Sequence, residues 1–206
     1  MTLIVLVRHG QTEWNRVERF RGRADVPLDE TGLAQAEVTA HRVAAEWYPV
    51  AIYSSPLSRA VRTAEAIARY FDLPVQTHQG LTDINYGQWQ GLTPDEARGC
   101  WPEIVDAWYR TPEMAFIPNG ETLSHLRVRV MKAIRELAAR HQRTTIVVVG
   151  HTVVNRAILL GILGLSNHYF WRLRQDTCAI NVLDVENEDF TLVSMNDTCH
   201  LRGQLG

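Results

Sequence analysis

Short strand-like runs that alternate with amphipathic segments constrain this sequence more than any other feature. The runs lie at residues 3–7, 51–55, 74–78 and 145–150. The first of them, LIVLV, is aliphatic throughout, which indicates a strand buried on both faces of a sheet. Parallel strands need crossover connections, which are usually helical. The alternation therefore predicts a three-layer α/β/α fold, with a mostly parallel sheet and helices on both faces.

Segments with helical periodicity lie between these runs and after the last of them. In residues 31–47 the apolar side chains recur at helical spacing, and Thr31 is a candidate N-cap. Further helices are predicted over residues 56–71, 121–141 and 153–164. The tail at residues 179–196 holds two alternating runs joined by a turn rich in Asn, Asp and Glu, which predicts a hairpin that completes the sheet.

The alternation fails between about residues 80 and 118, where aromatic residues occur among prolines, glycines and charges. We interpret this stretch as an inserted lid, helical or irregular, whose tryptophans form a small local core. The chain has 206 residues and a hydrophobic content of 46%, enough for one compact domain over residues 1–206.

The net charge and the cysteine content limit the classes of partner and the cellular compartment that we expect. The net charge of -2 gives no overall field that would hold nucleic acid or an anionic membrane. Three scattered cysteines make no disulfide framework and favour a reducing, cytoplasmic compartment. We find no export signal and no apolar stretch long enough to span a bilayer. We therefore expect a cytoplasmic protein with neither a nucleic-acid nor a membrane partner.

Charged side chains follow several of the predicted strands. Arg8 and His9 come directly after the first strand. Arg59 lies in the first turns of the helix after the second strand, and His151 follows the strand at residues 145–150. Parallel strands end at the same edge of a sheet, so these positions should lie close together. In an open parallel sheet, ligands bind at this edge, beyond the carboxyl ends of the strands. Guanidinium groups and helix N-termini bind phosphate oxygens, so this edge predicts a phosphoryl site.

Phosphoryl transfer without a metal needs a nucleophile, cations for the phosphoryl oxygens and an acid for the leaving oxygen. His9 can supply the nucleophile through one ring nitrogen if the other donates to a backbone carbonyl. Gly10, the next residue, lets the backbone approach the phosphate closely. These residues supply every part except the acid.

Four stretches of the sequence occur together and in order: LVRHGQTEWN, SSPLSRAVRTA, DINYGQWQG and VVGHTVVNRAIL. Together they resemble the signature regions of the histidine phosphatase superfamily, which has the phosphoglycerate mutase-like fold, over nearly the whole chain. The resemblance implies that His9 becomes phosphorylated. It also implies that Arg8, Arg59 and His151 form the phosphate pocket, and that Asn15 adds a phosphate donor.

The resemblance also identifies the missing acid. The family pattern places it at the third position of LTDINYGQWQGL, which makes Asp83 the acid where glutamate is commoner in the family. Thr152 follows the second histidine where glycine or serine is usual, and its backbone N–H can still face the phosphate. The substrate contacts that we predict are Arg8, Gln11, Asn15, Arg21, Gly22, Arg59, Asp83, His151 and Thr152.

Several charged residues have a simpler interpretation. For Arg62, three residues after Arg59, we favour an ion-paired or solvated position on the helix. The resemblance places Arg21 and Gly22 beside the substrate, and a plain loop position is an equal alternative for them. The remaining histidines show no metal-ligand spacing, so we predict neither a metal site nor a cofactor.

These expectations add up to a metal-independent phosphomonoesterase that hydrolyses small phosphorylated metabolites through a phosphohistidine. The alternatives are a phosphoglycerate mutase and a phosphoryl-binding regulator with little turnover. The modest insertion favours hydrolysis over mutase activity, since the mutases of the family look longer. Phosphoserine, sugar phosphates, phosphoglycerate derivatives and α-ribazole phosphate all remain open as substrates, and a homodimer remains open as the assembly.

Overall fold

The computed structural model describes residues 1–202. Residues 203–206 of the predicted domain 1–206 lie outside the described part. Its centre is a six-stranded sheet in the order β3-β2-β4-β1-β5-β6. The strands are β1 (Thr2–Arg8), β2 (Pro49–Ser54), β3 (Val75–Thr77), β4 (Thr145–Gly150), β5 (Ile180–Glu186) and β6 (Asp189–Asp197). Strands β1 to β4 are mutually parallel, and the β5–β6 hairpin joins β1 in antiparallel orientation. The predicted mostly parallel sheet and the closing hairpin are confirmed.

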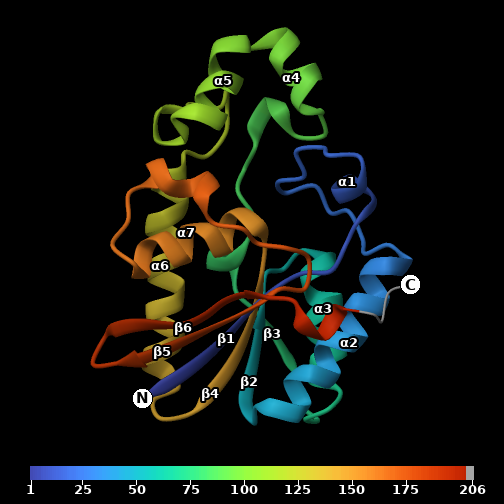
Figure 1. Cartoon of the computed structure of the whole chain (residues 1–206), viewed down its shortest axis with the longest axis vertical. Helices are drawn as coiled ribbons and strands as arrows, with labels where there is room; N and C mark the ends of the chain where they lie inside the picture. The colour runs from blue at the N-terminus through green and yellow to red at the C-terminus, as the bar shows by residue number, and fades with distance from the viewer. Residues whose placement is uncertain (203–206) are drawn as a thin grey trace.

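Two layers of helices enclose this sheet (Figure 1). On one face lie α2 (Glu30–Glu46) and α3 (Ser58–Ala68). On the other face lie α6 (Leu123–Arg140) and α7 (Thr152–Ile162). The predicted three-layer α/β/α fold is therefore confirmed. None of the helices within residues 1–202 is both long and apolar enough to cross a bilayer.

Strand β1 shows why the aliphatic run is needed. Val5 and Val7 belong to the cluster formed with α2 and α3, whereas Ile4 and Leu6 belong to the cluster formed with α6 and α7. All four side chains are completely buried. Because successive side chains of a strand point to opposite faces, a central strand between two helical layers must be apolar at every position.

The start of α2 differs from the sequence prediction. Asp29, rather than Thr31, is the N-cap, and its carboxylate accepts a hydrogen bond of 2.7 Å from the backbone N–H of Gly32. Thr31 already lies in the first turn. A Cβ atom on Gly10 would lie 2.4 Å from the carbonyl oxygen of Gly32, so glycine is required where the N-terminus of α2 meets the loop after β1. This contact fixes the loop that carries His9.

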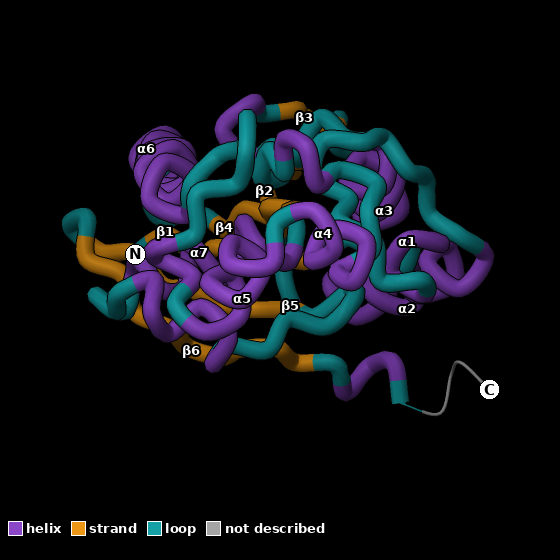
Figure 2. Tube along the Cα trace, turned by 90° about the horizontal axis from the view of Figure 1, so that it is seen from above, coloured by secondary structure: helices purple, strands orange, loops and turns teal. Residues whose placement is uncertain are grey.

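Shorter elements complete the chain. The remaining helices are α1 (Glu13–Arg16), α4 (Pro94–Cys100), α5 (Pro102–Arg110), η1 (Gln79–Leu81), η2 (Gly87–Trp89), η3 (Pro112–Met114), η4 (Asn167–Arg172) and η5 (Cys199–Leu201). Seen from above, α4 and α5 lie over the sheet, with α6 to one side and α2 and α3 to the other (Figure 2).

The tryptophans of the inserted segment belong to a larger core than the small local core that we predicted. Trp89 and Trp108 are almost completely buried, and their rings meet edge to face with centroids 6.3 Å apart. Trp108 also contacts Phe170, which follows α7. Both indoles belong to the same cluster as the residues beneath α6 and α7. The inserted segment is therefore joined to the main core.

Candidate active site

The carboxyl ends of β1, β2 and β4 lie next to one another. Arg8 pairs with Gly150 and Ser54 pairs with Val149 in the parallel ladders. The ladder continues past β1, where the N–H of His9 donates to the carbonyl of Gly150 at 3.0 Å. As a result, the rings of His9 and His151 lie with centroids 5.1 Å apart. The two histidines that are 142 positions apart in sequence therefore share one site.

The imidazole of His9 is held in its neutral form. Its side chain is buried, and Nδ1 lies 2.6 Å from the carbonyl oxygen of Gly10, which can only accept a hydrogen bond, so Nδ1 carries the proton. Burial lowers the pKa of His9 well below its usual value, with further lowering by the nearby charges of Arg59, His151 and Arg8. Nε2 is left unprotonated at neutral pH with its lone pair available for attack.

His151 is oriented by a residue to which the sequence assigned no role. Its Nε2 lies 2.7 Å from the hydroxyl oxygen of Ser55, the residue directly after β2. Its Nδ1 is buried, has no hydrogen-bond partner within residues 1–202, and lies 3.7 Å from an oxygen of Asp83. Burial also lowers the pKa of His151 well below the usual value. A polar residue at the end of a parallel strand was the signal that could have identified Ser55.

Two buried arginines anchor the site to backbone carbonyls. Arg8 Nη1 donates to the carbonyl of Gln175 at 2.6 Å. Arg59 donates from Nη1 to Ala24 and from Nη2 to Gly22, at 2.8 Å each. The Nε atoms of both arginines are buried and have no partner in the described part of the chain. Burial, followed by repulsion from nearby arginines, lowers the pKa of Arg8 to about 9. The site therefore carries excess positive charge, which an anion would neutralise.

Asp83 has the environment of a proton donor. It is buried, one carboxylate oxygen lies 3.2 Å from Arg59 Nη2, and the other accepts from the N–H of Ile84 at 2.9 Å. Burial raises the pKa of Asp83, and the charges of Arg59 and Arg21 only partly oppose that rise. By contrast, the carboxylates of Glu96 and Glu103 in the inserted segment are exposed on α4 and α5.

Hydrogen bonds hold the backbone on both sides of Asp83. Arg129 on α6 donates from Nη1 to the carbonyls of Gly80 and Thr82, at 2.9 and 2.8 Å. The same guanidinium is paired with Glu121 at 2.8 Å. The backbone N–H of Glu121 donates to the carbonyl of Asn85 at 2.8 Å. The Arg129–Glu121 pair thus fixes the backbone before and after Asp83.

Arg21 and Gly22 lie close to the segment that carries Asp83. Arg21 donates from Nη1 to the carbonyl of Trp14 at 3.0 Å, and its charge lowers the pKa of Asp83. Gly22 adopts a φ of 51°, and an added Cβ atom would lie 3.0 Å from the carbonyl oxygen of Ile84. Glycine relieves both constraints and places its own carbonyl on Arg59.

The three other predicted substrate contacts differ in the hydrogen bonds that their side chains already form within the protein. Asn15 uses its side-chain oxygen to accept from the N–H and the hydroxyl of Thr12, so its amide NH2 is the group left for a substrate. Gln11 donates from Nε2 to Asp29 at 3.1 Å, which draws that side chain toward α2. Thr152 is the first residue of α7, and its buried hydroxyl has no partner within residues 1–202.

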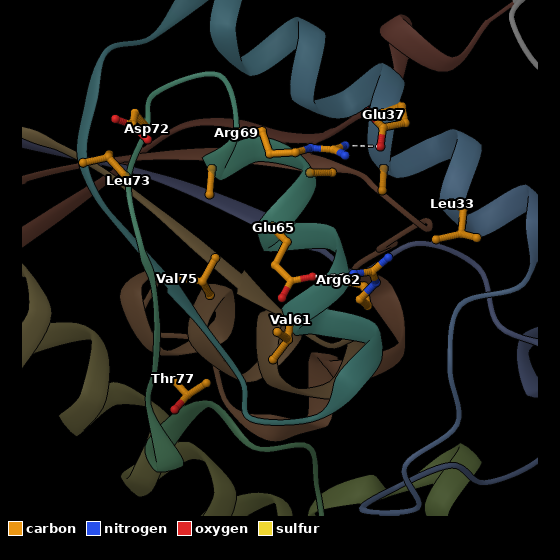
Figure 3. Close-up of a pocket in the computed structure, with 13 residues that line it drawn as sticks. Leu33, Glu37, Val61, Arg62, Glu65, Arg69, Asp72, Leu73, Val75 and Thr77 are labelled. Atoms are coloured by element: carbon orange, nitrogen blue, oxygen red, sulfur yellow. Dashed lines mark hydrogen bonds and ion pairs between the residues drawn. The ribbon is translucent and has the colours of Figure 1, made fainter.

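Arg62 lies outside this cluster. Its side chain is 63% exposed and pairs with Glu65 at 2.9 Å. Both residues line a cavity of about 590 Å³ between α2 and α3, where Leu33 and Val61 are also found (Figure 3). None of the predicted site residues lines this cavity. The interpretation of Arg62 as an ion-paired helix residue agrees with this position.

No group of three or more His, Cys, Asp or Glu side chains that could hold a metal ion occurs within residues 1–202. Five polar atoms of the predicted site residues are instead buried without a hydrogen-bond partner in the described part of the chain: Arg8 Nε, Arg21 Nε, Arg59 Nε, His151 Nδ1 and Thr152 Oγ1. The three arginine nitrogens and the threonine hydroxyl can all donate a hydrogen bond, so the chemistry of the set fits an oxyanion.

The profile of the histidine phosphatase superfamily (branch 1) matches residues 4–198. Phosphoserine phosphatase 1 of Hydrogenobacter thermophilus is 35% identical over 201 residues, covering 98% of this chain and 95% of that protein. The metal-independent phosphoserine phosphatase of Arabidopsis thaliana is 36% identical over 203 residues, covering 98% of this chain and 84% of that protein. The solved structure of Bacillus stearothermophilus YhfR matches with a TM-score of 0.94 at 28% identity, covering 98% of this chain and 100% of that one.

Proposed function

Since the chain belongs to the histidine phosphatase superfamily, branch 1, and is a phosphatase, we propose that it hydrolyses a small phosphorylated metabolite through a phosphohistidine on His9. The observation that carries the proposal is the state of His9. Its Nδ1 is committed to the carbonyl of Gly10, and the unprotonated Nε2 lies among buried arginines. A neutral imidazole beside uncompensated cations suits attack on a phosphoryl group.

In the first half-reaction the lone pair of His9 Nε2 forms a bond to phosphorus as the ester P–O bond breaks. Asp83, which burial keeps protonated to higher pH, gives its proton to the leaving oxygen. In the second half-reaction the Asp83 carboxylate takes a proton from water as the water oxygen attacks phosphorus. The N–P bond then breaks, its electron pair returns to Nε2, and inorganic phosphate leaves.

Arg8, Arg59 and His151 surround the phosphoryl oxygens in this proposal. Because Arg59 also contacts Asp83, it couples the phosphate pocket to the acid. Binding of a phosphate dianion would favour the protonated acid through like-charge repulsion. We also assign phosphate contacts to Asn15, Arg21, Gly22 and Thr152, and we place Gln11 at the edge of the pocket. The inserted segment at about residues 80–118 acts as the lid that excludes water from this chemistry.

Phosphoserine is the substrate that we propose first, because two relatives of similar length are named phosphoserine phosphatases. One of these is named as metal-independent, and the residues assigned here supply nucleophile, cations and acid without a metal. We therefore propose metal-independent hydrolysis. The test is phosphate release from a panel of phosphorylated metabolites, with EDTA present and with His9→Ala as the blank.

The expected result is turnover of phosphoserine above the other esters and none by His9→Ala. Preferred release from a sugar phosphate or from α-ribazole phosphate would replace the substrate and leave the mechanism standing. Isomerisation of 3-phosphoglycerate without net phosphate release would establish a mutase. Binding of phosphate with no turnover on any ester, including an aryl phosphate, would establish a phosphoryl-binding regulator.

A further inference from the structure

Arg156 is a cation beside the phosphate pocket that the mechanism leaves unused. It lies on α7, four residues after Thr152, so the two side chains share one face of the helix. Its guanidinium carbon lies 5.0 Å from the ring centroid of Phe170 and 4.9 Å from that of Trp171. Its Nε donates to the carbonyl of Leu173 at 2.7 Å. Two aromatic faces and one hydrogen bond fix the orientation of this guanidinium.

The same segment holds Arg8. The carbonyl of Leu173 accepts from Arg156, and the carbonyl of Gln175 accepts from Arg8. Residues two apart in sequence have Cα atoms at most about 7 Å from each other. The two guanidinium groups are thus anchored to neighbouring points of one backbone stretch. In agreement with this placement, the charge of Arg156 contributes to the lowered pKa of Arg8.

The charge of Arg156 has no acidic partner of its own. In the described part of the chain no carboxylate forms an ion pair with it, and the nearby Asp176 is paired with Arg174 at 2.8 Å. The Arg156 side chain is half-buried, and burial lowers its pKa. A fixed, partly desolvated and unpaired guanidinium favours an anion that comes from outside the chain.

We propose that Arg156 forms a subsite for a carboxylate on the alcohol part of the substrate, next to the phosphate pocket. The inference rests on the proposed hydrolysis and deepens it, because it assigns the residue that selects carboxylate-bearing phosphate esters. The phosphoryl group already has Arg8, Arg21 and Arg59 in the proposed mechanism, so a fourth guanidinium beyond them recognises a different group. A planar fork pairs bidentately with a carboxylate, and the short span between Arg8 and Arg156 fits an ester of few carbon atoms.

The first experiment compares substrates that differ only in the carboxylate. Phosphoserine and phosphoethanolamine form one such pair, and 3-phosphoglycerate and glycerol 3-phosphate form another. The native protein should prefer the carboxylate member of each pair in kcat/KM. In Arg156→Gln this preference should fall about 10- to 100-fold, which is the range expected for one charge-assisted hydrogen bond. Most of the loss should appear in KM.

Two further variants separate recognition from structure. Arg156→Lys keeps the charge and loses the planar fork, so it should retain part of the preference. Arg174→Gln removes an arginine from the same segment whose side chain is 80% exposed, and it should keep the native preference. An Arg156 that only supported Phe170 and Trp171 would lower turnover of both members of each pair equally.

Three results would overturn the inference. The first is that the native protein shows no preference for the carboxylate member of either pair. This result does not depend on whether any variant folds. The second is an equal loss on both members of a pair in Arg156→Gln and Arg156→Lys. The third is loss of the preference in Arg174→Gln, which would show that Arg174 rather than Arg156 forms the subsite. Phosphate release from esters without a carboxylate, combined with any of these results, would leave the proposed hydrolysis intact. Absence of release from every ester would reject that hydrolysis itself.

Discussion

Replacing Arg59 with alanine should cost stability as well as activity. Arg59 is completely buried, and its two terminal nitrogens donate to the carbonyls of Gly22 and Ala24. One of these nitrogens also contacts Asp83 at 3.2 Å. Alanine removes all of these donors and leaves two carbonyls unsatisfied beside a cavity. The loop at residues 22–24 and Asp83 then lose a shared anchor.

The size of the effect follows from these contacts. Each lost hydrogen bond to a charged donor costs about 1.5–3 kcal/mol, so the two carbonyl contacts together account for about 3–6 kcal/mol of unfolding free energy. The contact with Asp83 adds little to this sum, because burial already raises the pKa of Asp83 and the carboxyl can take up a proton instead. The loss of one cation from the phosphate pocket should also cost about 2–4 kcal/mol of transition-state stabilisation.

Urea unfolding and steady-state kinetics measure the two effects separately. Arg62→Ala is the matched control, since it lies one helical turn away and its side chain is 63% exposed in a pair with Glu65. It should change the unfolding free energy by less than about 0.5 kcal/mol. If Arg59→Ala loses less than about 1 kcal/mol of stability, or if Arg62→Ala loses more activity than Arg59→Ala, the placement of Arg59 is wrong.

Further predictions concern Asp83, the proposed acid, and Arg129, which holds its segment. Asp83→Asn should keep phosphate binding and lose far more kcat on alkyl than on aryl phosphates, as measured with one ester of each kind. Because burial raises the pKa of Asp83, kcat on the alkyl ester should decline as pH rises through that value, which a pH profile would reveal. Arg129→Gln should lower kcat about tenfold with little change in KM, by loosening the acid's segment, whereas the exposed Arg135→Gln should not. Activity should survive EDTA, and loss of activity restored by zinc or magnesium would contradict the metal-independent reaction.

Local patterns predicted the layers of the fold and missed details that depend on contacts between distant segments. The aliphatic run of β1 predicts a strand with helices on both faces because each of its faces must be covered. The Asp29 cap was missed in favour of Thr31, although Asp29 precedes Gly32 by the three residues that an N-cap needs. The start of α4 carried a further overlooked signal, since Thr93 and Glu96 form a capping box.

In the candidate site, too, some features follow from local sequence patterns and others depend on contacts between distant segments. Parallel strand ends meet at one edge, so the sequence alone could bring His9 and His151 together. The partners that hold the site could not be predicted in the same way. The bonds from Arg59 to Gly22 and from Arg8 to Gln175 join positions separated by 37 and 167 residues, and no local periodicity relates them. Arg156 went unassigned for the same reason, because its anchor on the carbonyl of Leu173 is a contact that its own helix does not reveal. Ser55 was overlooked even though it directly follows a predicted strand, because its contact with His151 spans 96 positions.

Trapping the phosphorylated protein tests the central claim most directly. The protein is mixed with a ³²P-labelled ester and quenched in alkali, and the labelled residue is located by peptide mapping. A phosphoramidate on His9 Nε2 is expected, stable to base and labile to acid, and it should be absent from His9→Ala. A label that maps to serine or to His151, or undiminished turnover by His9→Ala, would contradict the phosphohistidine mechanism.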